Sequence, residues 1–550
     1  MKKVLFVVTV TVFAACSVKK SSEKKVLNSP KLVVGVVVDQ MRYDYLTRFA
    51  SKFSENGFKK LMQEGFNCQE HHFSYMPTYT GPGHASVFTG TTPQTHGIIA
   101  NDWYNKKLKK YVYCAEDTLV KSVGGDFEGE NRSPRNLLVT TLGDQIKLKS
   151  NGKGKSIGIS IKDRGAILPA GKMANAAFWY RGGTDGLMIS STYYMDDLPN
   201  WVREFNTQKL PNKYLNQNWE TLLPIAEYTE SHGDDSPYEH SIMTGKKPVF
   251  PYDLVEGQKE HGLSLLKEVP FGNDYLLDFV KATIKGESLG KDTIMDFLSV
   301  SFSSPDYIGH DYGPNSIEIE DTYLRLDQNI ADLIAYLNKN VGEGEYVLFL
   351  TADHGVAQVP QELKDQGATV GYYNDSTILA RVKEELFTKY GDSNLIENYS
   401  NYQFFLNHDL IKTKGLKSKE ISHLVLVTSL EIPGVKSGLF GTDLSRKYFS
   451  NGMNRYVQKG WNMQRSGDVT LIMEPGWLSS RYEHKGGTSH GSPWAYDTHV
   501  PLLFFGLGIN SGSSSLKKTW VEDIVPTICN LIGVQAPMGS SGTTISEVLK

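Results

Sequence analysis

The segment KLVVGVVVD, residues 31–39, is an almost unbroken apolar run that ends on a carboxylate. A run of Val and Leu without alternating polar residues is typical of a strand covered on both faces, as in a parallel sheet between helices. In such sheets ligands bind beyond the carboxyl ends of the strands. The segment therefore predicts a buried parallel strand and a site residue, Asp39, at its end.

The same pattern recurs along the chain, with helical periodicity between the apolar runs. The further runs are KSIGISIKD (155–163), MDFLSVSFSSPD (295–306), YVLFLTADH (346–354) and HVPLLFFG (499–506). Helices are expected near residues 84–90, 136–148, 274–284, 316–339, 378–390 and 520–533. This alternation predicts an α/β fold, a doubly wound, mostly parallel central sheet sandwiched by helices.

Composition narrows the classes of function. The 550 residues include 58 Lys and Arg and 61 Asp and Glu, a formal net charge of −3, so no global basic field favours nucleic acid as a structural partner. Beyond Cys16 there are only Cys68, Cys114 and Cys529, in no CxxC pattern. The sequence allows one disulfide among these three cysteines, and buried free thiols are the simpler interpretation.

The N-terminus MKKVLFVVTVTVFAAC, residues 1–16, has the layout of a secretory signal, two lysines followed by a short apolar run. Its end, FAAC, resembles a bacterial lipobox, so Cys16 is either removed or kept as a lipidated N-terminus. Residues 17–30 are polar and predict a flexible tether. We expect residues 31–550 to form a single catalytic domain with insertions at about 172–272 and 362–480.

Several polar residues at the predicted strand ends have the chemistry of metal ligands. Asp306 and His310 stand one helical turn apart, and Asp353 and His354 are adjacent. With Asp39 and with His490, which lies in the loop KGGTSHGSPW, they make three carboxylates and three imidazoles. Mixed sites of this kind suit Zn²⁺ better than Ca²⁺ or Mg²⁺, which prefer oxygen ligands alone.

Each of these residues has a simpler explanation when taken alone, because an aspartate at a strand end often caps a helix and a lone histidine is usually hydrogen-bonded. The order Asp, Thr, Asp-x-x-x-His, Asp-His, His is more specific. It resembles the alkaline phosphatase superfamily, in the branch with a threonine nucleophile that includes nucleotide pyrophosphatases/phosphodiesterases and the phosphate-irrepressible (PafA-type) alkaline phosphatases. The resemblance covers most of the mature chain, through VVGVVVDQMRYDYL (33–46), HASVFTGTTPQTHGIIANDWY (84–104), YDTHVPLLFFG (496–506) and VEDIVPTICNLIG (521–533).

The resemblance implies two Zn²⁺ ions and assigns their ligands. One ion would be held by Asp306, His310 and His490. The other would be held by Asp39, Asp353 and His354 together with Thr80.

Thr80, in SYMPTYTGPGHASVFTG (74–90), is then the nucleophile. Zinc coordination makes a hydroxyl nucleophilic near neutral pH, and the helix expected to begin near His84 would add backbone N–H groups where a phosphate lies. The expected intermediate is a phosphothreonine. The alternative is that Thr80 only caps this helix.

Three more residues bear on the kind of phosphate ester. Lys162 and Arg164 stand two apart at an expected strand end, so both would face one side, and they resemble the PafA-type motif. Their two positive charges favour a monoester, which carries close to two negative charges, over a diester. Asn101 matches an asparagine that donates to a non-bridging phosphate oxygen. The simpler interpretations are a solvated strand end for the two cations and a turn for Asn101.

The sequence therefore predicts a secreted, zinc-dependent alkaline phosphatase that acts on small phosphate monoesters, periplasmic or at the cell surface. A monomer is favoured, and membrane attachment is expected only through a lipid on Cys16. The main alternative is a phosphodiesterase or nucleotide pyrophosphatase. A phosphonate hydrolase of the same fold and a catalytically idle metal-binding lipoprotein also remain open. His71, His72 and His499 are expected to be structural.

Overall fold

The structure, a computed structural model, describes residues 3, 29–125, 127, 129–483 and 486–550. The predicted signal segment and tether, with Cys16, lie almost wholly outside the described residues. Among the helices of the described part, none has the length and apolar character needed to span a bilayer. The three cysteines in that part, Cys68, Cys114 and Cys529, are buried and free.

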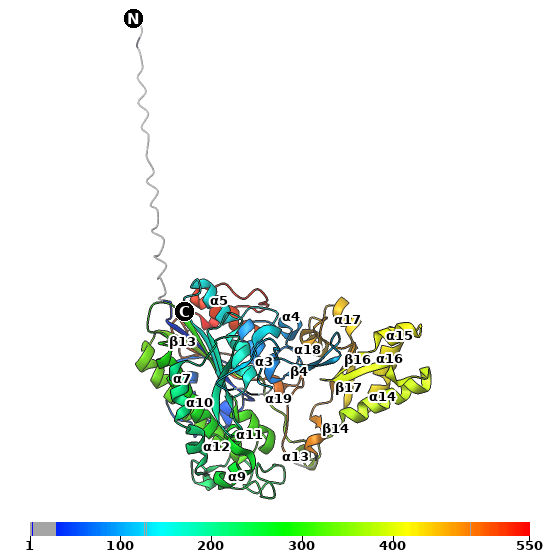
Figure 1. Cartoon of the computed structure of the whole chain (residues 1–550), viewed down its shortest axis with the longest axis horizontal. Coiled ribbons are helices and arrows are strands. Elements are labelled where there is room, and N and C mark those ends of the chain that lie inside the picture. The colour runs from blue at the N-terminus through cyan, green and yellow to red at the C-terminus, as the bar shows by residue number, and fades with distance from the viewer. Residues whose placement is uncertain (1–2, 4–28, 126, 128, 484–485) are drawn as a thin grey trace.

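A ten-stranded sheet forms the centre of the molecule (Figure 1). Its central strands β13, β1, β12, β7 and β8 are mutually parallel, whereas β20 and β9 run antiparallel to β13 and β8. The prediction of a doubly wound, mostly parallel sheet is confirmed. In sheet order the strands are β21 (Ser513–Ser515), β2 (Phe66–Cys68), β20 (Leu502–Gly506), β13 (Tyr346–Thr351), β1 (Leu32–Val38), β12 (Asp296–Phe302), β7 (Ser156–Ser160), β8 (Ala176–Arg181), β9 (Leu187–Ser191) and β6 (Ser122–Val123).

Helices cover both faces of this sheet. On one face α3 (Thr80–Thr89) packs through Phe88 against Phe297 and Phe349, with ring centroids 5.9 and 5.8 Å apart. On the other, α10 (Phe271–Gly286) packs through Phe279 against Phe178 at 5.5 Å. Gly35 of β1 permits the first contact, because a Cβ there would meet the ring of Phe88 at 2.6 Å. Burial on both faces explains why β1 lacks an alternating polar pattern.

Most predicted helices are present with shifted ends. The helices expected at 274–284, 316–339, 378–390 and 520–533 are observed as α10, α12 (Ile317–Leu337), α14 (Asp375–Tyr390) and α20 (Ile524–Ile532). The helix expected at 136–148 begins only at Leu142, as α5 (Leu142–Lys149), after a capping box at Thr141. Helix α3 begins at Thr80 rather than near His84, because Pro82 falls in the first turn, where its missing N–H removes no helical hydrogen bond.

The second predicted insertion carries its own core. A four-stranded sheet of β15 (Ile396–Ser400), β16 (Gln403–Leu406), β18 (Val469–Met473) and β17 (Val435–Phe440) packs with α14 and α16 (Ser418–Leu430) in a separate apolar cluster. This lobe extends to one side of the main body (Figure 1). Met76 belongs to its core and Tyr79 packs against it, so the lobe contacts the segment that leads to Thr80.

The first predicted insertion is attached in two ways. Its strands β8 and β9 extend the central sheet. Residues 218–228 are held by the buried carboxylate of Asp321 in α12, which accepts hydrogen bonds from Trp219 Nε1 (2.8 Å), Leu222 N (2.6 Å) and Tyr228 OH (2.6 Å). Arg325 Nε lies 2.7 Å from the same carboxylate and supplies the compensating charge.

We expect Asp321→Ala to lower the free energy of unfolding by about 3 kcal/mol, because it leaves buried donors and the Arg325 charge without their partner. Urea unfolding followed by circular dichroism measures the change. Asp332→Ala is the matched control on the same helix, since Asp332 is half exposed, and it should change stability by less than about 0.5 kcal/mol. Equal unfolding midpoints for the two variants would refute this role of Asp321.

Candidate active site

The carboxyl ends of four adjacent parallel strands place the candidate residues together. Strands β13, β1, β12 and β7 lie side by side and point the same way, so their ends share one edge of the sheet. The chain beyond them supplies Asp353 and His354, Asp39, Asp306 and Lys162 respectively, and all five are buried. Residues far apart in sequence thus meet in one site.

One group of donors consists of Asp39, Asp353 and His354. His354 Nε2 lies 3.5 Å from Asp39 Oδ1, 3.4 Å from Asp353 Oδ2 and 3.4 Å from the Thr80 hydroxyl. These two carboxylate oxygens are buried and accept no hydrogen bond of good geometry among the described residues, although His84 Nδ1 lies 3.3 Å from Asp353 Oδ2. Buried, unsatisfied anionic oxygens facing an imidazole nitrogen fit a bound cation.

The second group of donors surrounds Asp306. Its Oδ1 lies 3.3 Å from His310 Nε2 and 3.6 Å from His490 Nε2. Helix α11 (Ser304–Tyr312) presents Asp306 and His310 on successive turns, as their spacing predicts. The side chains around Asp306 whose donor atoms all lie within 4.8 Å of one another are Asp306, His354 and His490. His354 therefore belongs to both groups of donors.

The backbone orients three of these imidazoles in the same way. His354 Nδ1 lies 2.9 Å from Gly355 O, His310 Nδ1 lies 2.8 Å from Thr488 O, and His490 Nδ1 lies 2.7 Å from Thr78 O. Each carbonyl accepts the Nδ1–H and leaves the lone pair on Nε2, which faces the carboxylates. Metal-binding histidines are oriented by partners of this kind.

The electrostatics indicate an excess of negative charge. Burial, reinforced by the nearby Asp353 carboxylate, raises the pKa of Asp39 well above its usual value despite the ammonium group of Lys162. Burial also lowers the pKa of His490 and of His354, so both favour the neutral, ligating form. For Asp306 burial is outweighed by His310 and Lys162, and the pKa of this carboxyl is lowered. A divalent cation would relieve the repulsion among the carboxylates.

Thr80 is the first residue of α3, whose N-terminus abuts the carboxyl end of β13. The fit is close, because a Cβ on Gly83 would meet the carbonyl oxygen of Asp353 at 2.3 Å. Gly81 N–H donates to Asn101 Oδ1 at 2.7 Å. The positive end of the helix therefore lies beside the Thr80 hydroxyl, which suits a phosphate. The N–H groups of Gly81 and Gly83 already donate to Asn101 Oδ1 and to Tyr79 O, and Pro82 has none.

The placement of Lys162 and Arg164 differs from the expected strand end. Strand β7 ends at Ser160, Lys162 is the N-cap of α6 (Asp163–Ala170), and Arg164 lies in its first turn. The idea that both side chains leave one face of a strand is wrong. Lys162 Nζ lies 2.6 Å from Asp39 Oδ2 and also contacts Asp306 Oδ2, so it sits between the two donor groups.

Arg164 is held by a residue outside the two donor groups. It donates from Nη1 to Tyr113 OH at 3.3 Å, and its buried Nε has no partner among the described residues. Asp163, next to it, accepts from Tyr113 OH and from Arg132 Nε, which fixes this turn. Unused guanidinium donors are what an anionic ligand requires.

Gln40, near both donor groups, was not singled out from the sequence. Gln40 donates from its backbone N to Asp353 Oδ1 (3.1 Å) and from Nε2 to Asp306 Oδ1 (2.7 Å), so it links both groups. Its position directly after Asp39 was the available signal. Asp497 accepts from the backbone N–H groups of Gly491 and Ser492, and thereby holds the loop of His490.

A cavity of about 240 Å³ lies between this site and the lobe of β15–β18. Asn101 and His490 line it from the main body, and Tyr373, Tyr402 and Arg481 line it from the second predicted insertion and the chain that follows it. Space for a substrate substituent therefore adjoins the donor groups.

Comparison with known proteins places the chain in a family. The family model described as type I phosphodiesterase / nucleotide pyrophosphatase matches residues 33–498, the span that contains all the candidate residues. The chain belongs to this family. It is 41% identical to alkaline phosphatase PhoV of Synechococcus elongatus over 95% of this chain and 93% of the relative.

Two further relatives match at full length. The chain is 44% identical to a protein of Myroides odoratus named calcium-transporting ATPase, over 96% of both chains. It is 41% identical to alkaline phosphatase PafA of Elizabethkingia meningoseptica over 94% of both. The crystal structure of PafA superposes with a TM-score of 0.90 over 95% of this chain and 99% of that chain. The resemblance drawn from the sequence motifs is confirmed.

Proposed function

We propose that this protein is a zinc-dependent alkaline phosphatase that hydrolyses phosphate monoesters through a phosphothreonine. The observation that carries the proposal is the pair of cations beside the two donor groups, the buried Lys162 and the half-buried Arg164. Full-length similarity to two alkaline phosphatases supports it. The proposed site comprises Thr80, Asn101, Lys162 and Arg164 with the six Asp and His residues described above.

The donor set fits two Zn²⁺ ions. Asp39, Asp353, His354 and the Thr80 hydroxyl would hold one, and Asp306, His310 and His490 the other. When bound, zinc supplies the positive charge that lowers the pKa of a neighbouring hydroxyl group or water and neutralises a departing oxygen. The unsatisfied oxygens of Asp39 and Asp353 are the structural observation behind this fit.

Thr80 forms the new bond in the first step. Its Oγ attacks phosphorus, the bond from phosphorus to the ester oxygen breaks, and the alcohol departs. In the second step water attacks the phosphothreonine, the Thr80 Oγ–P bond breaks and inorganic phosphate leaves. The N-terminal position of Thr80 in α3 keeps the hydroxyl at the positive end of the helix dipole.

The remaining residues bind the phosphoryl oxygens. Lys162 supplies a point charge and Arg164 a planar guanidinium whose Nε has no partner among the described residues. Asn101 accepts from Gly81 N–H through Oδ1, which directs its amide NH₂ away from that contact and toward use as a donor. Three positively polarised groups match the charge of a monoester better than that of a diester.

The test of this function compares kcat/KM for matched aryl phosphate mono- and diesters on zinc-saturated protein. We expect Lys162→Ala and Arg164→Ala each to lower monoester kcat/KM by roughly 10²-fold, and diester kcat/KM by much less. Lys52→Ala is the control for removing a partly buried lysine, because Lys52 pairs with Glu230 and Glu320 in a different part of the fold. Lys52→Ala should leave kcat/KM for both substrates unchanged.

A diester preference in the unmodified protein, unchanged by removal of the two cations, would contradict the proposal. The function would then be that of a phosphodiesterase or nucleotide pyrophosphatase, the activity in the description of the family model.

The export, the domain organisation and the oligomeric state of the enzyme are also proposals. We infer that residues 1–16 direct export to the periplasm or cell surface and that residues 31–550 act as one catalytic domain, as a monomer. Mass spectrometry of the mature N-terminus decides between a free protein and one anchored through a lipid on Cys16.

A further inference from the structure

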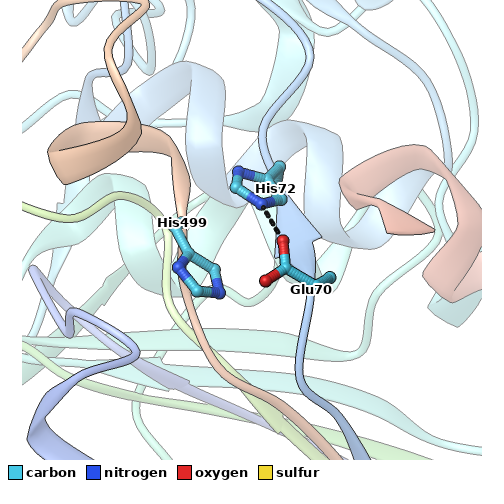
Figure 2. Close-up of side chains that lie close together, drawn as sticks. All are labelled: Glu70, His72 and His499. Carbon is cyan, nitrogen blue, oxygen red and sulfur yellow. Dashed lines mark hydrogen bonds and ion pairs between the residues drawn. The ribbon is translucent and has the colours of Figure 1, made fainter. Parts of the chain in front are cut away.

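Three metal-ligand side chains lie together outside the candidate active site (Figure 2). Glu70, His72 and His499 each place one donor atom within 4.8 Å of the donors of the other two. His72 lies in β3 (His71–His72), with Glu70 just before it, while His499 precedes β20. The two histidines were expected to be structural, and no spacing in the sequence links them.

The backbone brings the two imidazoles face to face. His72 and His499 form an antiparallel bridge, and their rings stack with centroids 4.6 Å apart at an interplanar angle of 13°. Tyr43 stacks on His499 as well, at 4.7 Å and 12°. Packing therefore places both rings beside Glu70, and one imidazole has to turn out of this parallel stack for both rings to direct a nitrogen at one ion.

Polar partners hold one nitrogen of each ring. Gln69 O lies 2.8 Å from His499 Nε2, and the hydroxyl of Thr498 lies 3.5 Å from His72 Nδ1. The Gln69 carbonyl accepts from His499 Nε2–H and leaves the lone pair on His499 Nδ1, whereas the Thr498 hydroxyl can either donate to His72 Nδ1 or accept from it. His72 Nε2 lies 3.2 Å from Glu70 Oε2, and Figure 2 shows a nitrogen of each ring turned toward the Glu70 carboxylate.

We propose that Glu70, His72 and His499 bind a further divalent ion, Zn²⁺ by the chemistry of the donors. Two imidazoles and one carboxylate leave a fourth tetrahedral position for water. The Glu70 side chain is 45% exposed and the His72 side chain 8%, so the buried ring lies behind a carboxylate that solvent reaches. An ion can enter from that side.

Such an ion would tie together two segments that support the active site. The chain continues from His72 toward Thr80, and Asp497, two residues before His499, holds the loop of His490. The ion would act as a structural clamp between β3 and the start of β20. The proposal does not depend on the proposed phosphatase function.

The test measures zinc per chain by mass spectrometry of the full-length protein after dialysis against micromolar free zinc. We expect Glu70→Gln, His72→Gln and His499→Gln each to bind one ion fewer than the unmodified protein. His408→Gln is the matched control, because His408 pairs with Asp468 at 2.8 Å but belongs to no three-donor group in the described part of the chain. It should retain the full zinc content.

Thermal unfolding with and without zinc supplies the second readout. A metal clamp predicts that the three variants lose a zinc-dependent rise in Tm, since a ligand that binds only the folded state stabilises it. If His72→Gln fails to fold, the half-exposed Glu70→Gln keeps the test decisive. Unchanged zinc content in all the variants that fold would overturn the proposal. The comparison between variants holds whether or not the enzyme cleaves phosphate esters.

Discussion

Thr80→Ala should lower kcat/KM for an aryl phosphate monoester by roughly 10⁴-fold or more, because it removes the atom that bonds to phosphorus. The hydroxyl has no substitute on the same turn, since the residues that follow Thr80 are Gly81, Pro82 and Gly83. Alanine fits the first turn of a helix, so the fold of α3 should be kept. Steady-state kinetics on zinc-saturated protein measures the loss.

Two further experiments test whether the loss is due to the Thr80 hydroxyl. Thr80→Ser keeps a hydroxyl and should retain much more activity than Thr80→Ala. Acid quenching with a ³²P-labelled substrate should trap phosphate on residue 80 in the unmodified protein and none in the alanine variant. Turnover by Thr80→Ala at the unmodified rate would exclude the threonine as nucleophile.

Removal of metal should reduce phosphatase activity to the background rate, and added Zn²⁺ should restore it. The proposed chemistry needs a cation to lower the pKa of the Thr80 hydroxyl. Without one, Asp39 Oδ1 and Asp353 Oδ2 have imidazole nitrogens of His84 and His354 beside them at 3.3 to 3.5 Å but accept no hydrogen bond of good geometry among the described residues. Mg²⁺ or Ca²⁺ should not replace zinc, because imidazoles supply half of the proposed carboxylate and imidazole ligands.

Point variants separate the ligands from other buried carboxylates. Asp353→Asn should lower both zinc content and activity. Asp144→Asn alters an equally buried carboxylate in the capping box of α5 and should keep both. Full activity of a chelated, zinc-free sample would refute a metal-dependent mechanism.

The parts of the fold that the sequence predicted are those set by local pattern. Every residue of β1 is apolar or glycine, as burial on both faces of the sheet requires. Asp39 follows at the strand end, where ligands bind in such sheets. The start of α3 was misplaced because Gly-Pro-Gly weakens helix propensity, although Pro82 is compatible with a first turn. Lys162 and Arg164 were assigned to a strand because the apolar run continues through Ile161, one residue past the last paired residue of β7.

The sequence by itself determined which residue types stand at the strand ends, and through their order it indicated a family. Which side chains meet was decided only by the tertiary structure. The sharing of His354 between two donor groups, the bridging role of Gln40, and the cluster of Glu70, His72 and His499 all depend on strand order and register. Those contacts join residues that are distant in the chain, and hydrophobic periodicity carries no information about which distant segments pair.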